Sequence, residues 1–112
     1  MSGKGTQIPT IFRTMVKNRD RSKCCRCGMN GAEWHHRRSR SVVDDCQHAV
    51  CNGVWLCRRC HTWVHKHPFE AREAGLIVSR YAVPHDEPVR TVQHGWVRLR
   101  HDGTVVPHER ED

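Results

Sequence analysis

The chain has 112 residues, of which only 37% are apolar, so it has room for one domain whose small core would usually need disulfides or a structural metal. The 19 Lys and Arg residues against 12 Asp and Glu residues give a net charge of +7, which favours a polyanionic partner, nucleic acid first. No stretch is apolar enough for an export signal or a membrane span, which argues against a secreted disulfide protein or a membrane protein and predicts a cytoplasmic location.

The order of apolar and polar segments predicts an α+β fold in three sections. Residues 1–9 are expected to form a flexible arm, and residues 10–82 the main domain. Within that domain we expect a short basic helix, two strands, a longer helix and a short helix that begins at Pro68 and stops at Gly75. The corresponding ranges are 10–23 for the first helix, 33–37 and 54–57 for the strands, 58 onward for the longer helix and 68–74 for the last.

The C-terminal section is expected to be β-like. Residues 76–83 alternate weakly between apolar and polar, which favours a strand. Residues 83–112 form the predicted extension, in which 95–106 fold as a hairpin that turns on Asp102-Gly103, and the last residues fray.

Four of the seven cysteines form two Cys-x-x-Cys pairs, Cys24 with Cys27 and Cys57 with Cys60. Each pair can point two thiolates at one ion, and two pairs complete the closed four-sulfur site that suits structural zinc. The interval between the pairs is longer than in a minimal zinc ribbon, which predicts a functional insert held at both ends by the zinc. The other three cysteines are interpreted only as buried thiols: Cys25, Cys46 and Cys51.

Four histidines lie in positions that favour a second metal site. His35 and His36 are adjacent in a predicted strand and so point to opposite faces, whereas His61 and His65 share one face of the predicted helix. Neutral imidazoles of His35, His61 and His65 can surround one divalent cation and leave positions open for water and a phosphate oxygen. The alternative, scattered surface histidines, does not account for the paired spacing.

The run Glu33-Trp-His-His-Arg37, followed by Asn52-Gly-Val-Trp-Leu-Cys57-Arg-Arg-Cys60-His61-x-x-x-His65, resembles the HNH family of nucleases. The similarity is greatest to the small zinc-containing members encoded by bacteriophages, and it covers about residues 20–78. It implies a ββα-metal (His-Me finger) fold, stapled here by the Cys₄ zinc site and followed by the C-terminal β-hairpin. The implied activity is metal-dependent nicking of DNA, in the host cytoplasm if the gene belongs to a phage. Phage relatives often act beside the DNA-packaging terminase, which makes such a packaging protein a candidate partner.

Position by position, the resemblance implies that His36 is the general base that activates water. His35, His61 and His65 would then bind the catalytic cation, which is Mg²⁺, Mn²⁺, Ni²⁺ or Zn²⁺. Asn52 would brace the loop between the strands and help to orient the base. In-line attack is implied, with 5′-phosphate and 3′-hydroxyl ends as products.

Basic side chains beside the proposed site are candidates for binding DNA phosphates, although an arginine-rich loop can also be a merely solvated surface. The candidates are Arg37, Arg38, Arg40, Arg58, Arg59 and Lys66.

Two other readings compete with the nuclease. A non-catalytic zinc ribbon that binds nucleic acid explains the cysteines and the charge but gives no role to His35, His36 or Asn52. A c-type cytochrome is suggested by Cys57-Arg-Arg-Cys60-His61, which matches a haem-attachment site, but it requires export and leaves the first cysteine pair without a role.

Overall fold

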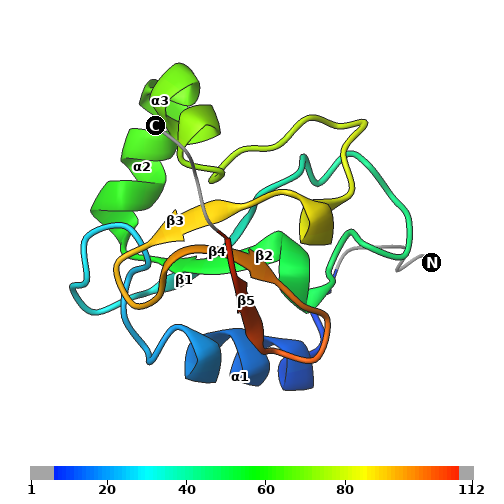
Figure 1. Cartoon of the computed structure of the whole chain (residues 1–112), viewed down its shortest axis with the longest axis horizontal. Coiled ribbons are helices and arrows are strands. Elements are labelled where there is room, and N and C mark those ends of the chain that lie inside the picture. Colours follow the sequence, from blue (N-terminus) through cyan, green and yellow to red (C-terminus); the bar gives the residue numbers. More distant parts are fainter. Residues whose placement is uncertain (1–6, 109–112) are drawn as a thin grey trace.

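Two antiparallel sheets and three α-helices form residues 7–108, the part of the chain that the computed structural model describes. The expected flexible arm up to residue 6 and the frayed tail from residue 109 lie outside this part. The described residues confirm a small α+β fold, shown in Figure 1. None of their helices is long and apolar enough to cross a membrane.

Helix α1 (Thr10–Arg19) is shorter than the predicted 10–23. It ends at Arg19 because Arg21 and Ser22 both take a φ of 60°, a left-handed conformation that stops a helix. Its buried side chains are Val16 and Arg19, so this mostly polar helix is held by a narrow apolar contact and by an arginine.

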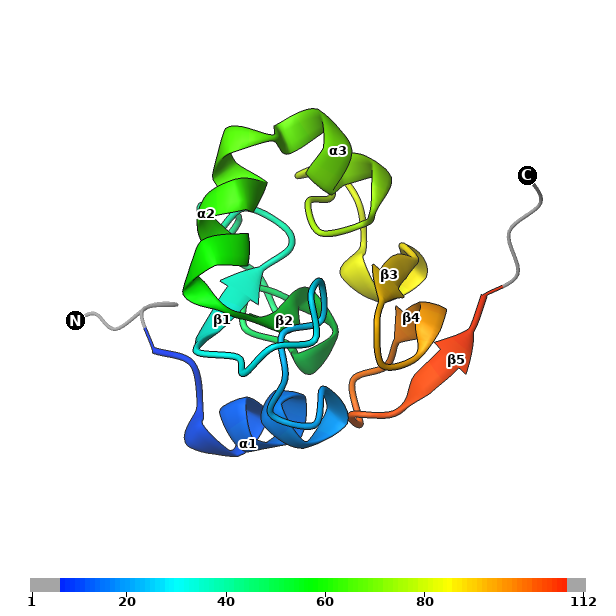
Figure 2. The same cartoon turned by 90° about the vertical axis from the view of Figure 1, so that its left-hand side faces the viewer.

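The centre of the molecule is the hairpin of β1 (Glu33–His36) and β2 (Gly53–Leu56), which is followed directly by α2 (Arg58–Lys66). These bounds lie within a residue of the predicted ones. β1 and β2 pair antiparallel with His36 opposite Gly53, and α1 and α2 lie on opposite sides of the pair, as Figure 2 shows. A Cβ at Gly53 would lie 2.2 Å from the Trp34 ring, so only glycine allows this close approach.

After α2, the chain forms the short helix α3 (Pro68–Glu73), which stops at Gly75 with a φ of +78°. The prediction of a strand over 76–83 is wrong, because these residues form turns and bends. Among them, only the Val78 amide donates to the segment that follows β1, at the carbonyl of Arg37. The 3-10 turn η2 (Pro84–Asp86) follows and leads into the second sheet.

The predicted C-terminal hairpin exists, but it belongs to a three-stranded sheet. β3 (Val89–Thr91), β4 (Gly95–Leu99) and β5 (Val105–Pro107) pair antiparallel in that order. β4 contacts η2 and also η1 (Val50–Asn52), the 3-10 turn just before β2. The extension therefore packs on the region that carries the predicted catalytic motif.

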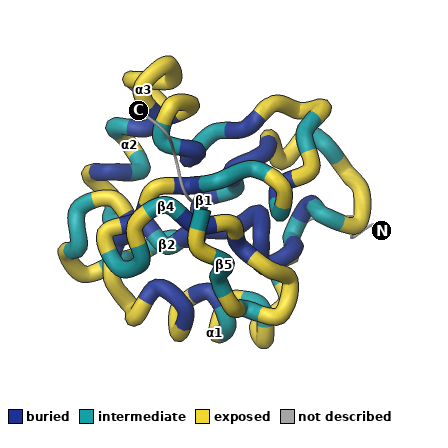
Figure 3. Tube along the Cα trace, viewed as in Figure 1, coloured by how far each residue is buried: buried dark blue, intermediate teal, exposed yellow. Residues whose placement is uncertain are grey.

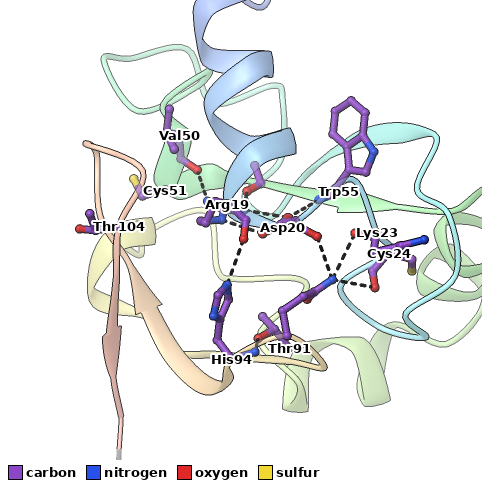
Figure 4. A network of polar contacts seen from close by, with 12 residues as sticks. Arg19, Asp20, Lys23, Cys24, Val50, Cys51, Trp55, Thr91, His94 and Thr104 are labelled. Atoms are coloured by element: carbon purple, nitrogen blue, oxygen red, sulfur yellow. Dashed lines mark hydrogen bonds and ion pairs between the residues drawn. The ribbon is translucent and has the colours of Figure 1, made fainter.

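A buried ion pair joins the end of α1 to β2 and to η1, the 3-10 turn before it (Figure 4). Arg19 Nε donates to Asp20 Oδ1 at 2.8 Å, and the same guanidinium donates to the carbonyls of Val50 and Gly53. Asp20 Oδ2 accepts from the amide of Trp55 at 2.8 Å. Since a buried charge without its partner is costly, this network fixes how α1 sits against β2.

The core is shared by the two sheets and α2. Buried residues of β2, α2, β3 and β4 form one cluster, and Cys24, Cys51 and Cys60 belong to it. Buried stretches of chain gather in the middle of the molecule, whereas α3 is largely exposed (Figure 3). Cys27 and Cys57 pack against this cluster, so a metal held by the four-cysteine group would add to a small apolar core.

Candidate functional site

The two cysteine pairs come together as their spacing predicts. The sulfur atoms of Cys24, Cys27, Cys57 and Cys60 all lie within 4.8 Å of one another. The Sγ atoms of Cys27 and Cys57 are 3.7 Å apart. Tetrahedral zinc with Zn–S bonds of about 2.3 Å requires sulfurs about 3.8 Å apart. These four cysteines could therefore hold a metal ion such as zinc.

Local groups favour the ionised form of one sulfur of this cluster, that of Cys57, whereas burial raises the pKa of Cys27 and of Cys60. Burial opposes ionisation of Cys57, but hydrogen bonds, including one from the Cys60 amide at the start of α2, outweigh it and lower the pKa of Cys57 to about 7. Arg26 donates to Cys60 Sγ at 3.4 Å while its guanidinium stacks 3.5 Å from the centre of the Trp63 ring. Four thiolates around Zn²⁺ would leave net negative charge, which this arginine would partly offset.

The three predicted histidine ligands also converge. His35 projects from β1, and His61 and His65 from one face of α2, with their candidate ligand atoms all within 4.8 Å of one another. His35 is 4% exposed, whereas His65 is an exposed residue of α2. This group could hold one metal ion with an open side, unlike the closed group of cysteines.

Hydrogen bonds decide which nitrogens of these rings are free. His35 Nε2 lies 2.6 Å from the carbonyl oxygen of Leu76, which can only accept, so this nitrogen donates and Nδ1 carries the lone pair. His61 Nδ1 donates to Glu33 Oε1 at 2.6 Å, which leaves Nε2 for a cation. Burial lowers the pKa of His35 to about 4, so its ring is neutral, as metal binding requires.

His36 follows His35 in β1, so the two side chains leave the strand on opposite faces. Both residues nevertheless line the same cleft. The Nε2 atom of His36 lies 2.9 Å from Nδ1 of His48, so one of these nitrogens donates and the other accepts. Burial, with smaller effects of His48, Arg40 and Arg13, lowers the pKa of His36 to about 4. The ring is therefore neutral at pH 7 and can accept a proton.

Asn52 is fully buried and joins two parts of the long loop between β1 and β2. Its Oδ1 accepts from the Arg38 amide at 2.7 Å, and its Nδ2 donates to the Gln47 carbonyl at 3.0 Å. His48, which pairs with His36, directly follows Gln47. The side-chain amide of Asn52 therefore fixes the segment that carries His48. These two hydrogen bonds of Asn52 connect the start of the loop, at Arg38, to its later part, at Gln47.

Two of the predicted phosphate-binding residues do not face solvent. Arg37 is 1% exposed, and its guanidinium donates to the carbonyls of Gly75, Cys51, Pro84 and Glu87. Arg38 is 5% exposed and pairs with Asp44. Both arginines are used to hold loops together, because an unpaired buried guanidinium would be costly, and their assignment to DNA is corrected.

The remaining basic candidates are exposed but only one lies in the cleft. Arg40 lines the cleft beside His36. Arg58, Arg59 and Lys66 are exposed on α2 outside it, with Arg58 Nε 3.7 Å from Glu33 Oε2 at its edge. The sequence had not singled out the other three arginines that line the cleft: Arg13, Arg72 and Arg80.

Glu33 and His48 were also missed. Glu33 stands two residues before His35, so the alternation of β1 places both on the same side, and this periodicity could have identified it. The hydrogen bond from His61 lowers the pKa of Glu33. His48 lies in an irregular loop, where no periodic signal exists.

Comparison of the chain with family models, with curated proteins and with solved structures finds no match. The geometry of the two clusters and of the cleft is therefore the basis for assigning a function.

Proposed function

We propose that this protein is a metal-dependent endonuclease of the HNH, ββα-metal kind, which hydrolyses DNA phosphodiester bonds and nicks one strand at a time. The observation that supports this most strongly is the convergence of His35, His61 and His65 in a cleft that also contains His36. Three imidazoles from a strand and a helix leave coordination positions open, as catalytic metal sites require.

Each residue of the cleft has a separate role in the proposed reaction. A divalent cation held by His35, His61 and His65 would neutralise charge on the phosphate and on the departing 3′-oxygen. Glu33 orients His61 through the hydrogen bond to Nδ1. His36 accepts the proton of the attacking water. His48 orients the His36 ring through their hydrogen bond, and Asn52 holds the segment that carries His48.

The charge of the cleft suits a polyanion. Arg13, Arg40, Arg72 and Arg80 line it, and Glu33 is its only acidic residue among those described. The guanidinium groups that line the cleft together with the histidines can bind the phosphates that flank the scissile bond. Because contacts to phosphates do not depend on the identity of the bases, the cleft by itself predicts binding to DNA of any sequence.

The test is incubation of the purified protein with supercoiled plasmid in EDTA, Mg²⁺, Mn²⁺, Ni²⁺ or Zn²⁺, beside His36→Ala. We expect metal-dependent conversion to nicked circles that falls at least about 100-fold in the variant, while DNA binding on a gel is retained. A fully active His36→Ala protein would overturn the assignment of the base. DNA that is bound but never cut with any metal would instead identify a non-catalytic zinc-ribbon binding module.

A further inference from the structure

A third group of metal-ligand side chains lies away from the cleft, where three distant parts of the chain meet. Cys51 belongs to η1, His85 to η2, and His101 to the turn between β4 and β5. Their candidate ligand atoms all lie within 4.8 Å of one another. Neither the Cys₄ group nor the three-histidine group uses any of these residues.

We propose that Cys51, His85 and His101 bind a further transition-metal ion, with zinc as the ion that fits best. One thiolate and two imidazoles are a ligand set that zinc takes readily, and they leave one position for water. This proposal does not depend on the proposed nuclease activity.

The separations within the group are close to those that a shared ion requires. Cys51 Sγ lies 3.7 Å from Nδ1 and 3.9 Å from Nε2 of His101, so a rotation of this exposed ring would aim one nitrogen at an ion beside the sulfur. Tetrahedral zinc, with bonds of about 2.3 Å to sulfur and about 2.0 Å to nitrogen, places these atoms about 3.5 Å apart. The rings of His85 and His101 pack edge to face with centroids 5.0 Å apart.

His85 supplies an independent observation. Its Nδ1 is buried and has no hydrogen-bond partner among the described residues. A buried ring nitrogen without a partner is uncommon, since it forfeits its hydrogen bond to water. On the other side of the ring, Asp86 Oδ1 lies 3.5 Å from Nε2. A carboxylate there favours the proton on Nε2 and leaves the lone pair on Nδ1, as in a carboxylate–histidine–metal arrangement.

The site also has an opening to solvent and a structural consequence. His85 and His101 line a small cleft together with Asp86, Asp102 and Arg98, while Cys51 lies fully buried behind them. An ion there would tie the β4–β5 turn to η1, whose last residue is Asn52. The C-terminal sheet would then be held to the loop that positions His36.

The first test counts zinc in the full-length folded protein by native mass spectrometry. His101→Gln and His85→Gln should each hold one zinc fewer than the wild-type protein, and His67→Gln, an exposed histidine outside all three groups, should hold the same number. Because the variants differ at one group, the other sites cancel in the comparison. Equal zinc content in all four proteins would overturn the proposal.

A second test reads the sulfur ligand alone. In protein produced with cobalt, the near-ultraviolet thiolate-to-cobalt absorption comes only from cysteine-containing sites, so the three-histidine group is silent. Cys51→Ser should remove about one fifth of this absorption, one thiolate of five, whereas Cys46→Ser should not change it. Unchanged absorption in Cys51→Ser would contradict the assignment of this sulfur as a ligand.

Discussion

The Cys₄ group and the three-histidine group share helix α2 but differ in almost every physical property. Cys60 and His61 are neighbours in the sequence, and the rotation of about 100° per helical residue turns one into the core and the other into the cleft. Cys24 and Cys60 are buried, whereas His61 is half-buried and His65 exposed. A closed set of four soft ligands suits a metal that stabilises the fold, and an open set of three suits a metal that meets a substrate. One short helix thus fixes the distance between the Cys₄ group and the three-histidine group.

Removal of a cysteine ligand is the strongest test of this contrast. Cys57→Ala should abolish the cooperative melting transition and the bound zinc, because a structural zinc site supplies on the order of 10 kcal/mol, comparable with the whole stability of a small domain. Circular dichroism against temperature and the zinc content measure the effect. Cys46→Ala is the matched control, since Cys46 lies outside the four-sulfur group, and it should melt cooperatively. A normal transition in Cys57→Ala would remove the structural half of the comparison.

Loss of a histidine ligand should have the opposite profile. His65→Ala removes one of three ligands at an exposed helical position, where alanine is well tolerated, so stability should change by less than about 0.5 kcal/mol. Affinity for Mn²⁺, measured by calorimetry on protein that carries zinc at the cysteine group and no ion at the histidines, should fall by more than about 100-fold, because this change removes a ligand rather than a group behind one. His67→Ala should bind Mn²⁺ as the unaltered protein does. If His65→Ala unfolds instead, the histidines are structural and the contrast fails.

Glu33 sharpens the comparison, because it acts on the histidine group without belonging to it. Glu33→Gln keeps the size of the side chain but weakens the acceptor for His61 Nδ1, which lies 2.6 Å away. Affinity for Mn²⁺ should fall about 10–100-fold, the usual effect of losing a partner behind a ligand. Glu70→Gln, on exposed α3 and outside the cleft, is the control. An unchanged affinity in Glu33→Gln would show that the hydrogen bond does not orient the ring.

Both groups could be predicted because their spacing is local. Cys-x-x-Cys and His61 with His65 each depend on a single turn or helix, and the period of β1 separates His35 from His36. Whether an arginine is buried or exposed depends instead on contacts with residues far away in the sequence. Arg37 is buried because Gly75, Pro84 and Glu87 present carbonyls to it, about 38 to 50 residues away. No local pattern encodes such contacts, and the same holds for His85 and His101 meeting Cys51.

The arginines of the cleft provide the finest distinction, because each should contribute only one phosphate contact. Arg80→Ala should lower DNA affinity a few-fold and reduce the slope of log affinity against log salt by about 1, while Arg59→Ala, exposed on α2 outside the cleft, should leave the slope unchanged. Fluorescence anisotropy with a labelled duplex at several salt concentrations measures both quantities. Since Arg80 lines the same cleft as the histidines, a phosphate held by Arg80 would lie in the cleft that contains the open metal site. Equal slopes for the two variants would mean that DNA lies along α2 rather than in the cleft. The scissile phosphate would then not reach the three histidines, which would contradict their proposed role.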